Sequence, residues 1–217
     1  MSTRSGAPTL VLFPTELEQR RFHDLGGLPC GFGLEAVCGF GPVAAAARTT
    51  QLCERLRPAR LLLLGIAGTY DGERLPVGTA IPFGRVTLDG VGVGQGPGHL
   101  GPTALGFPQL PGDEPAASDS LDLEAPPEHA ESLLLTTAAA SADAGESAMR
   151  QQRFPDALAE DMEGHAVALA GFVTGTPVSI VRGFSNVVGD RDAANWRIQN
   201  ALSAARRVAL ELLEEVR

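Results

Sequence analysis

Apolar and polar residues follow one another along the chain in a pattern that predicts strands and helices in turn. Short apolar runs that end at proline or glycine predict strands, and apolar residues at helical spacing predict the helices between them. By these criteria we expect strands at residues 9–13, 34–38, 60–65, 157–162 and 177–183, and helices at residues 43–56, 164–174 and 192–217. Further strands are expected within 77–86 and at 91–93, and a helix or strand near 130–137.

The order strand, helix, strand, helix, strand at the start of the chain predicts an α/β fold with a mixed, largely parallel central sheet. The run RLLLLG at residues 60–65 is almost entirely apolar, which is typical of a strand buried on both faces. A length of 217 residues suits one domain of this class, so we expect a single domain over residues 1–217. Glycine and proline crowd residues 88–128, where we expect long acidic loops.

The charged residues and cysteines exclude several classes of function. With 17 basic and 26 acidic residues the net charge is −9, and no clustered basic face is available for nucleic acid. Every basic residue is arginine, which excludes lysine Schiff-base and P-loop chemistry. No apolar run reaches the ~18 residues of a membrane span. The start of the chain resembles no signal peptide, and Cys30, Cys38 and Cys53 form no disulfide pattern, so we expect a cytoplasmic protein.

Two predicted turns in the first third of the chain have the small residues that ligand sites require. The segment GFGPVA at residues 39–44 fits the G-x-G-x-x-A fingerprint of dinucleotide sites. The next strand ends at GIAG, residues 65–68, without the acid that would hold a ribose, so a tight packing turn is the preferred interpretation. Ala67 and Gly68 fit equally well a sharp turn and a backbone that a ligand can approach.

Polar residues beside the later strands are the other candidates for chemistry. Glu163 falls at a strand-to-helix junction, where it fits either an acceptor for two sugar hydroxyls or a first-turn helix acid. Ser185 and Asn186 follow the strand predicted at residues 177–183, and the asparagine fits a turn or an amide directed at a ligand. Helix-capping spacing is found at Thr15 with Glu18, and at Asp190 and Asp192.

Four segments taken together resemble the nucleoside phosphorylase/nucleosidase superfamily: GFGPVAAA, LLLLGIAG, FPDALAEDMEG and SIVRGFSNVVGD. The sequence looks most similar to the hydrolytic branch, which includes methylthioadenosine/adenosylhomocysteine nucleosidases and futalosine hydrolases. The resemblance covers about residues 9–85 and 130–215. It implies a three-layer αβα domain, a small-molecule purine nucleoside as substrate, no metal or organic cofactor, and a homo-oligomer of two or more chains.

The resemblance also implies roles for residues that follow the two later strands. Glu163 matches the glutamate that binds the ribose 2′- and 3′-hydroxyls, and Met162 matches the methionine packed beside the sugar. Asn186 matches the position that faces N7 of the purine, with Ser185 before it. We therefore expect these four residues to contact the sugar and the base of the substrate.

Near the start of the chain the resemblance implies residues that handle the nucleophile. Ala67 and Gly68 match the turn whose backbone helps to hold it. In the segment PTELE, Glu18 matches the glutamate that activates water, and Glu16 is the alternate. The capping-box spacing of Glu18 competes with this role. Acids at this place would repel phosphate, which favours hydrolysis over phosphorolysis.

Two departures from the adenine-specific nucleosidases bear on the base. Those enzymes carry aspartate where this chain has Asn186, and an amide NH2 can donate to the N7/O6 edge of a 6-oxopurine. The segment TTAAASA at residues 136–142 lacks their base-stacking phenylalanine, for which Phe107 or Phe184 are possible substitutes. The amide therefore favours a 6-oxopurine nucleoside, and the resemblance implies hydrolysis of futalosine, with release of hypoxanthine in menaquinone biosynthesis. A purine nucleoside phosphorylase, a methylthioadenosine/adenosylhomocysteine nucleosidase and a non-enzymatic nucleotide-binding module are the alternatives.

Overall fold

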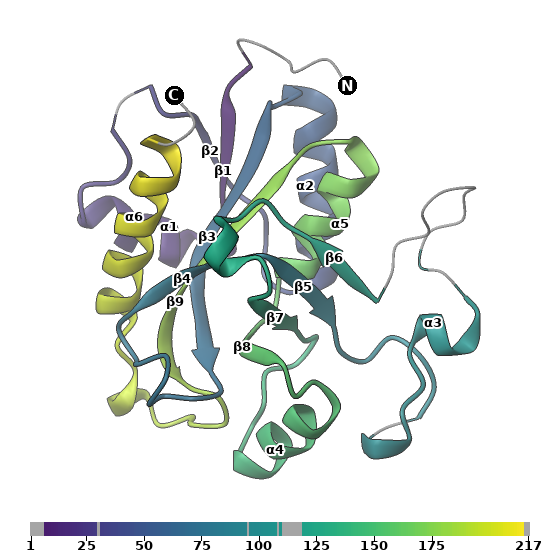
Figure 1. Ribbon diagram of the computed structural model, residues 1–217. Helices are drawn as coiled ribbons and strands as arrows, with labels where there is room; N and C mark the ends of the chain where they lie inside the picture. Colours follow the sequence, from purple (N-terminus) through teal and green to yellow (C-terminus); the bar gives the residue numbers. More distant parts are fainter. Residues whose placement is uncertain (1–6, 30, 95, 108, 110–118, 215–217) are drawn as a thin grey trace.

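The computed structural model describes residues 7–29, 31–94, 96–107, 109 and 119–214. In this part of the chain a 9-stranded sheet has helices on both faces (Figure 1). The strands are β1 (Thr9–Phe13), β2 (Leu34–Val37), β3 (Arg60–Thr69), β4 (Ala80–Phe83), β5 (Arg85–Leu88), β6 (Ser120–Asp122), β7 (Leu133–Thr136), β8 (Ala157–Asp161) and β9 (Val178–Val187). The helices are α1 (Glu16–Asp24), α2 (Pro42–Leu56), α3 (Pro102–Leu105), α4 (Ala144–Arg153), α5 (Gly164–Thr174) and α6 (Ile198–Glu214).

Strand β3 organises the sheet. It lies between β1 and β9, both parallel to it, and β8 pairs antiparallel with its last residues, Gly68 and Thr69. From β8 the sheet continues through β7, β5 and β6, and beyond β1 it ends at β2. The pairs β3–β8, β4–β9 and β5–β6 are antiparallel and the other pairs are parallel. The predicted mixed, largely parallel sheet is confirmed.

Alternate residues of β3 enter two separate cores. Leu61 and Leu63 pack on the side of α2 and α5, whereas Leu62 and Leu64 pack on the side of α1 and α6. The two pairs of helices lie on opposite sides of the sheet (Figure 1). Successive side chains of a strand point to opposite faces, so a strand covered on both sides must be apolar throughout. The predicted three-layer αβα architecture is confirmed.

Strands β3 and β9 are longer than predicted. The sequence places turns at residues 65–68 and after residue 183, but the two strands stay paired to Thr69 and Val187, with a bulge between Ala67 and Gly68. Gly65 does not end β3. Its lack of a side chain lets Arg182 and Glu18 pack closely against the strand. A Cβ at this position would overlap Arg182 Nη1 and lie 2.7 Å from Glu18 Oε1. Ser185 and Asn186 therefore lie within β9 and not beyond it.

Five further elements differ from the prediction. Helix α4 was not predicted, because it has no buried residue and so lacks an apolar stripe, although Asp143 caps it. The strand expected at residues 91–93 is only a bridge between Val93 and Leu100. The region expected as loops contains α3 and β6 among its described residues. The last helix begins at Ile198, and Asp192 caps a short 3-10 turn before it.

Two of the three cysteines lie in the core on the side of α2 and α5. Cys38 and Cys53 are buried there, and Cys30 lies outside the described residues. No helix in the part of the chain that the structure describes is long and apolar enough to cross a membrane.

Candidate active site

A cavity of about 280 Å³ lies where β1, β3, β8 and β9 end. The predicted site residues that line it are Glu18, Ala67, Gly68, Met162, Glu163, Ser185 and Asn186. Glu16 is not among its lining residues: its side chain is 78% exposed and faces Arg20 at 3.7 Å on the surface of α1. The structure thus places Glu18, and not the alternate Glu16, at the cavity.

Glu18 is held in place by donors from two elements. The hydroxyl of Thr15 donates to Glu18 Oε2 at 2.7 Å, and the backbone amide of Ile66 donates to Oε1 at 3.1 Å. The amide of Glu18 in turn donates to Thr15 Oγ1, the N-cap of α1. The capping role and the place in the cavity are therefore compatible, and the cap fixes the carboxylate beside β3.

Glu163 stands just before α5 but does not cap that helix. Its Oε1 accepts a 2.9 Å hydrogen bond from the amide of Gly41, and its Oε2 lies 3.5 Å from Arg182 Nη2. The helix start is served instead by Asp161, whose Oδ2 accepts from the amide of Gly164 at 2.8 Å. Glu163 is thus at the N-terminus of α5 by position, but its side chain is bonded to Gly41 and Arg182 and not to the amides of the helix.

The turn between β2 and α2 supplies the donor for Glu163. Gly39 and Gly41 have φ angles of +100° and +82°, which only glycine adopts without strain, and Pro42 starts α2. The amide of Gly41, which a dinucleotide site would direct at a phosphate, is bonded to the carboxylate of Glu163. The turn thus serves the cavity by orienting a side chain.

Arg182 is the main site-forming residue that the sequence did not reveal. This β9 residue is fully buried, and its Nε and Nη2 donate to Asp161 Oδ2 at 3.0 and 2.6 Å. Its Nη1 has no hydrogen-bond partner among the described residues and lies beside Gly65, on the side of Glu18 Oε1. The available signal was an arginine inside the apolar run SIVRG, since a buried charge requires a partner.

Burial sets the proton affinity of this cluster. It raises the pKa of Glu163 to about 7 against the opposing charge of Arg182, while nearby Asp161 adds to the rise. Burial also raises the pKa of Glu18, although Arg182, Thr15 and the amide of Ile66 oppose it. A carboxylate with a raised pKa is a stronger base near neutral pH. Glu18 is thus suited to accept a proton.

The side chain of Asn186 is fully hydrogen-bonded within β9 and the turn after it. Its Oδ1 accepts from the hydroxyl of Ser185 at 2.7 Å. Its Nδ2 donates to the carbonyl oxygens of Val187 and Asp190 at 2.9 and 3.2 Å. Both N–H groups are therefore engaged, and donation to a base requires the contact with Asp190 to be exchanged for one with the ligand.

The aromatic residues at the cavity differ from those expected. Phe184 is fully buried in the core, and Phe107 is 72% exposed and outside the cavity lining. Phe40 and Trp196 line the cavity instead, and the guanidinium of Arg191 lies 5.0 Å from the Trp196 ring centroid. Among the described residues no group of three His, Cys, Asp or Glu side chains could hold a metal ion.

The sequence and the fold are both similar to those of known nucleoside-cleaving enzymes. A sequence model of the phosphorylase superfamily matches residues 35–216. A futalosine hydrolase of Streptomyces coelicolor is 37% identical over 182 residues, which cover 82% of this chain and 76% of that protein. A futalosine hydrolase of Thermus thermophilus is 31% identical, with 95% of each chain covered. The fold is similar to that of a methylthioadenosine/adenosylhomocysteine nucleosidase of Colwellia psychrerythraea in complex with adenine, with a TM-score of 0.77, 21% identity, and 96% of this chain and 95% of that chain covered.

Proposed function

We propose that this chain, which belongs to the phosphorylase superfamily, hydrolyses the N-glycosidic bond of futalosine and releases hypoxanthine. The two futalosine hydrolases that it matches at 37% and 31% identity support this substrate. The reaction would belong to the route that makes menaquinone. The observation that carries hydrolysis is the position of Glu18, a buried carboxylate at the cavity wall.

The attacking nucleophile in the proposed reaction is water. Glu18 takes a proton from a water molecule while the water oxygen bonds to C1′ of the sugar. A phosphate nucleophile would be repelled by this carboxylate unless cations faced it. Arg182 directs its Nε and Nη2 at Asp161, and Arg191, the arginine in the cavity lining, lies against the Trp196 ring. The side chain of Glu18 therefore favours hydrolysis over phosphorolysis.

The other residues serve the sugar and the leaving base. Glu163 accepts hydrogen bonds from the 2′- and 3′-hydroxyls, with Met162 beside the sugar, and these bonds strengthen as positive charge develops on the ribose. The bond from C1′ to the base breaks with its electron pair on the base, and Asn186 donates to N7 or O6 to stabilise that charge. The backbone of Ala67 and Gly68, which line the cavity at the end of β3, helps to hold the water.

An adenine nucleosidase is the second candidate, because the fold is also that of a methylthioadenosine/adenosylhomocysteine nucleosidase. Asn186 favours the 6-oxopurine, as an amide cannot give N7 a proton. The test is incubation with futalosine, inosine and methylthioadenosine, followed by identification of the released base. Hypoxanthine from futalosine as the fastest reaction supports the proposal, and preferential release of adenine contradicts it.

We also propose that the chain assembles as a homo-oligomer. Phe40 and Val43, at the start of α2 beside the cavity, are 66% and 83% exposed, and Leu17 of α1 is 47% exposed. Exposed apolar side chains at one place favour a protein contact. Light scattering should give the mass of at least two chains, and Val43→Glu should lower it.

A further inference from the structure

The lining of the cavity combines four acids with a single cationic side chain among the described residues. The acids are all buried: Glu18, Glu160, Asp161 and Glu163. The cation is Arg191, which lies in the segment between β9 and α6. Because the chain has a net charge of −9, an anionic ligand would be repelled from this cavity unless a positive group compensated for the acids. Arg191 is the lining residue that can do so.

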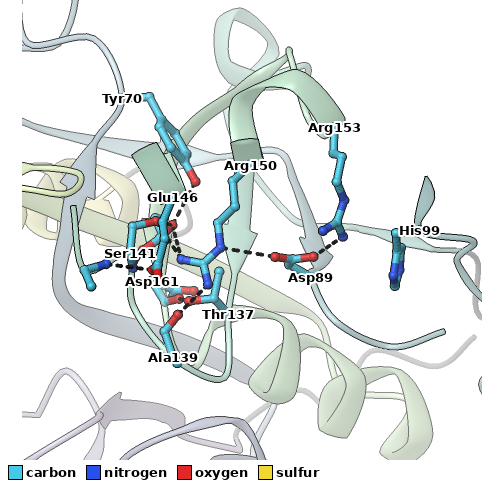
Figure 2. A network of polar contacts seen from close by, with 12 residues as sticks. Tyr70, Asp89, His99, Thr137, Ala139, Ser141, Glu146, Arg150, Arg153 and Asp161 are labelled. Carbon is cyan, nitrogen blue, oxygen red and sulfur yellow. Dashed lines mark hydrogen bonds and ion pairs between the residues drawn. The ribbon is translucent and has the colours of Figure 1, made fainter. Parts of the chain in front are cut away.

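Two other arginines lie near the cavity, but neither is among its lining residues. Arg182 directs its Nε and Nη2 at Asp161. Arg150 of α4 donates to acceptors of four residues, as Figure 2 shows: Asp89, Ala139, Ser141 and Glu160. The carboxylate of Glu160 also accepts from the amide of Ser141 at 2.7 Å. Both guanidinium groups thus hold acids of the cavity wall in place.

Arg191, by contrast, has free donors. Its guanidinium makes no hydrogen bond or ion pair with a residue that the structure describes, and it lies 5.0 Å from the Trp196 ring centroid. Cation–π attraction holds a guanidinium against a ring while its N–H groups stay available at the edge. The ring is itself fixed, because Trp196 Nε1 donates to the carbonyl oxygen of Asp190 at 3.2 Å. The carboxylates of Asp190 and Asp192 accept hydrogen bonds from other groups of the same turn.

Arg191 lies at the open end of the cavity. It is exposed, as is Phe40, whereas the proposed catalytic residues are at most 6% exposed: Glu18, Glu163 and Asn186. In the proposed reaction the buried end takes the base and the carbon that is attacked. The part of the nucleoside beyond C5′ of the sugar therefore extends toward the exposed end.

The exposed end fits an aromatic group that carries an anion. Phe40 and Trp196 offer aromatic surfaces, and the planar guanidinium of Arg191 matches a carboxylate with two parallel hydrogen bonds. Futalosine has such a group, because beyond C5′ it carries an aromatic ring with a carboxylate. Inosine and methylthioadenosine have no charge at that end.

We infer that Arg191 binds the carboxylate at the far end of the substrate and selects futalosine against nucleosides that are uncharged there. The inference rests on the proposed function, because it takes futalosine as the substrate. Trp196 is a positioning residue for Arg191. Neither the apolar pattern nor the resemblance singled out Arg191, which stands in the sequence between Asp190 and Asp192, two acids with helix-capping spacing.

The test compares kcat/KM for futalosine with kcat/KM for the primary amide made from its carboxylate. The wild type should favour futalosine about 10-fold, a smaller ratio than for a buried ion pair, because Arg191 remains in contact with water. Arg191→Gln should cleave the two compounds about equally, and Arg191→Lys should recover part of the preference. Both variants are expected to fold, since the side chain is exposed.

The matched control is Arg207→Gln. It removes the same charge from an exposed arginine of α6 that is not part of the cavity lining, so the wild-type ratio should persist. Three results would overturn the inference: equal cleavage of futalosine and its amide by the wild type, the wild-type ratio in Arg191→Gln, or the same loss of preference in Arg207→Gln.

Failure of the proposed function gives a different result. If the wild type cleaves inosine or methylthioadenosine but not futalosine, the proposed function is contradicted, and calorimetric titration with futalosine and its amide decides the inference without turnover. Tighter binding of futalosine than of the amide, lost in Arg191→Gln, supports the inference. Equal binding of the two compounds, or no binding of futalosine, contradicts it.

Discussion

The backbone amide of Gly41 donates a 2.9 Å hydrogen bond to Oε1 of Glu163, across 122 positions of the chain. Arg182 lies 3.5 Å from the other oxygen, so two elements far apart in sequence fix the orientation of this carboxylate. A side chain held in this way is ready to accept sugar hydroxyls without rearrangement. The first three predictions concern Glu163 and the cluster around Arg182.

Glu163→Gln should lower kcat/KM for futalosine by at least about 10²-fold. The amide oxygen can still accept from Gly41, so the fold is expected to persist, but the charged hydrogen bonds to the sugar are lost. Steady-state kinetics measure the loss, and circular dichroism checks the fold. A variant with the wild-type rate would show that Glu163 does not bind the sugar.

Glu163 should make the free energy of unfolding fall as the pH rises from about 4.5 to about 7, whereas His165, whose pKa burial lowers from 6.5 to about 4, contributes a rise over much of the same range. Burial raises the pKa of Glu163 from 4.5 to about 7, so within this window the folded chain binds a proton that the unfolded chain has released. Raising the pH therefore disfavours the folded state. Urea unfolding at a series of pH values isolates the contribution of Glu163 as a difference between two proteins: between pH 4.5 and 7, the free energy of unfolding of the wild type should fall relative to that of Glu163→Gln as the pH rises. An identical slope in both proteins would mean that another group causes the pH dependence.

Gly65→Ala should displace Arg182 and Glu18 and so lower both stability and activity. The added Cβ would overlap Arg182 Nη1 and crowd Glu18 Oε1, and both groups are buried. Overpacking of this kind costs about 1–3 kcal/mol, so Tm should fall by several degrees and kcat/KM by more than about 10-fold. Gly98→Ala is the control, because a Cβ there meets no heavy atom within 4 Å. Equal behaviour of the two variants would show that the contact at Gly65 has no consequence.

Asn186→Asp should shift the choice of base toward adenine. The carbonyl oxygens of Val187 and Asp190 face this side chain and would favour a protonated aspartate, which can give N7 a proton. We expect hypoxanthine release to fall and the ratio for adenine nucleosides to improve about 10- to 100-fold. Rates of base release from inosine and methylthioadenosine measure this ratio. An unchanged preference would mean that Asn186 does not face the base.

The fold could be predicted from the sequence because its strands and helices are specified by a local, periodic pattern of apolar residues. The strand Arg60–Thr69 alternates between two cores, and that alternation leaves a continuous apolar run. The ends of β3 and β9 could not be predicted, since glycine and polar residues there reflect packing against each other and against the site. Helix α4 was missed because it has no fully buried residue to mark an apolar face, and its cap at Asp143 is the signal that remains.

In the site, too, the sequence identified residues in recognisable segments and missed those whose role depends on distant partners. Glu163 and Asn186 were found because their segments resemble known motifs. Arg182 and Glu160 owe their importance to partners 21 and 19 positions away or more, namely Asp161 for the arginine and Ser141 for the glutamate. A pattern along the chain does not show which buried charges will meet. The folded sheet brings Glu160 to the cavity lining and places Arg182 beside Gly65, bonded to Asp161.

Turnover of futalosine in phosphate-free, ¹⁸O-enriched water tests the proposed hydrolysis most directly. Mass spectrometry of the products should show free hypoxanthine and one ¹⁸O atom in the sugar product, at a rate that added phosphate does not change. Glu18→Gln, which removes the proton acceptor for water, should lower that rate by about 10²-fold or more. Turnover that requires phosphate and yields a sugar 1-phosphate without label would contradict hydrolysis by this chain.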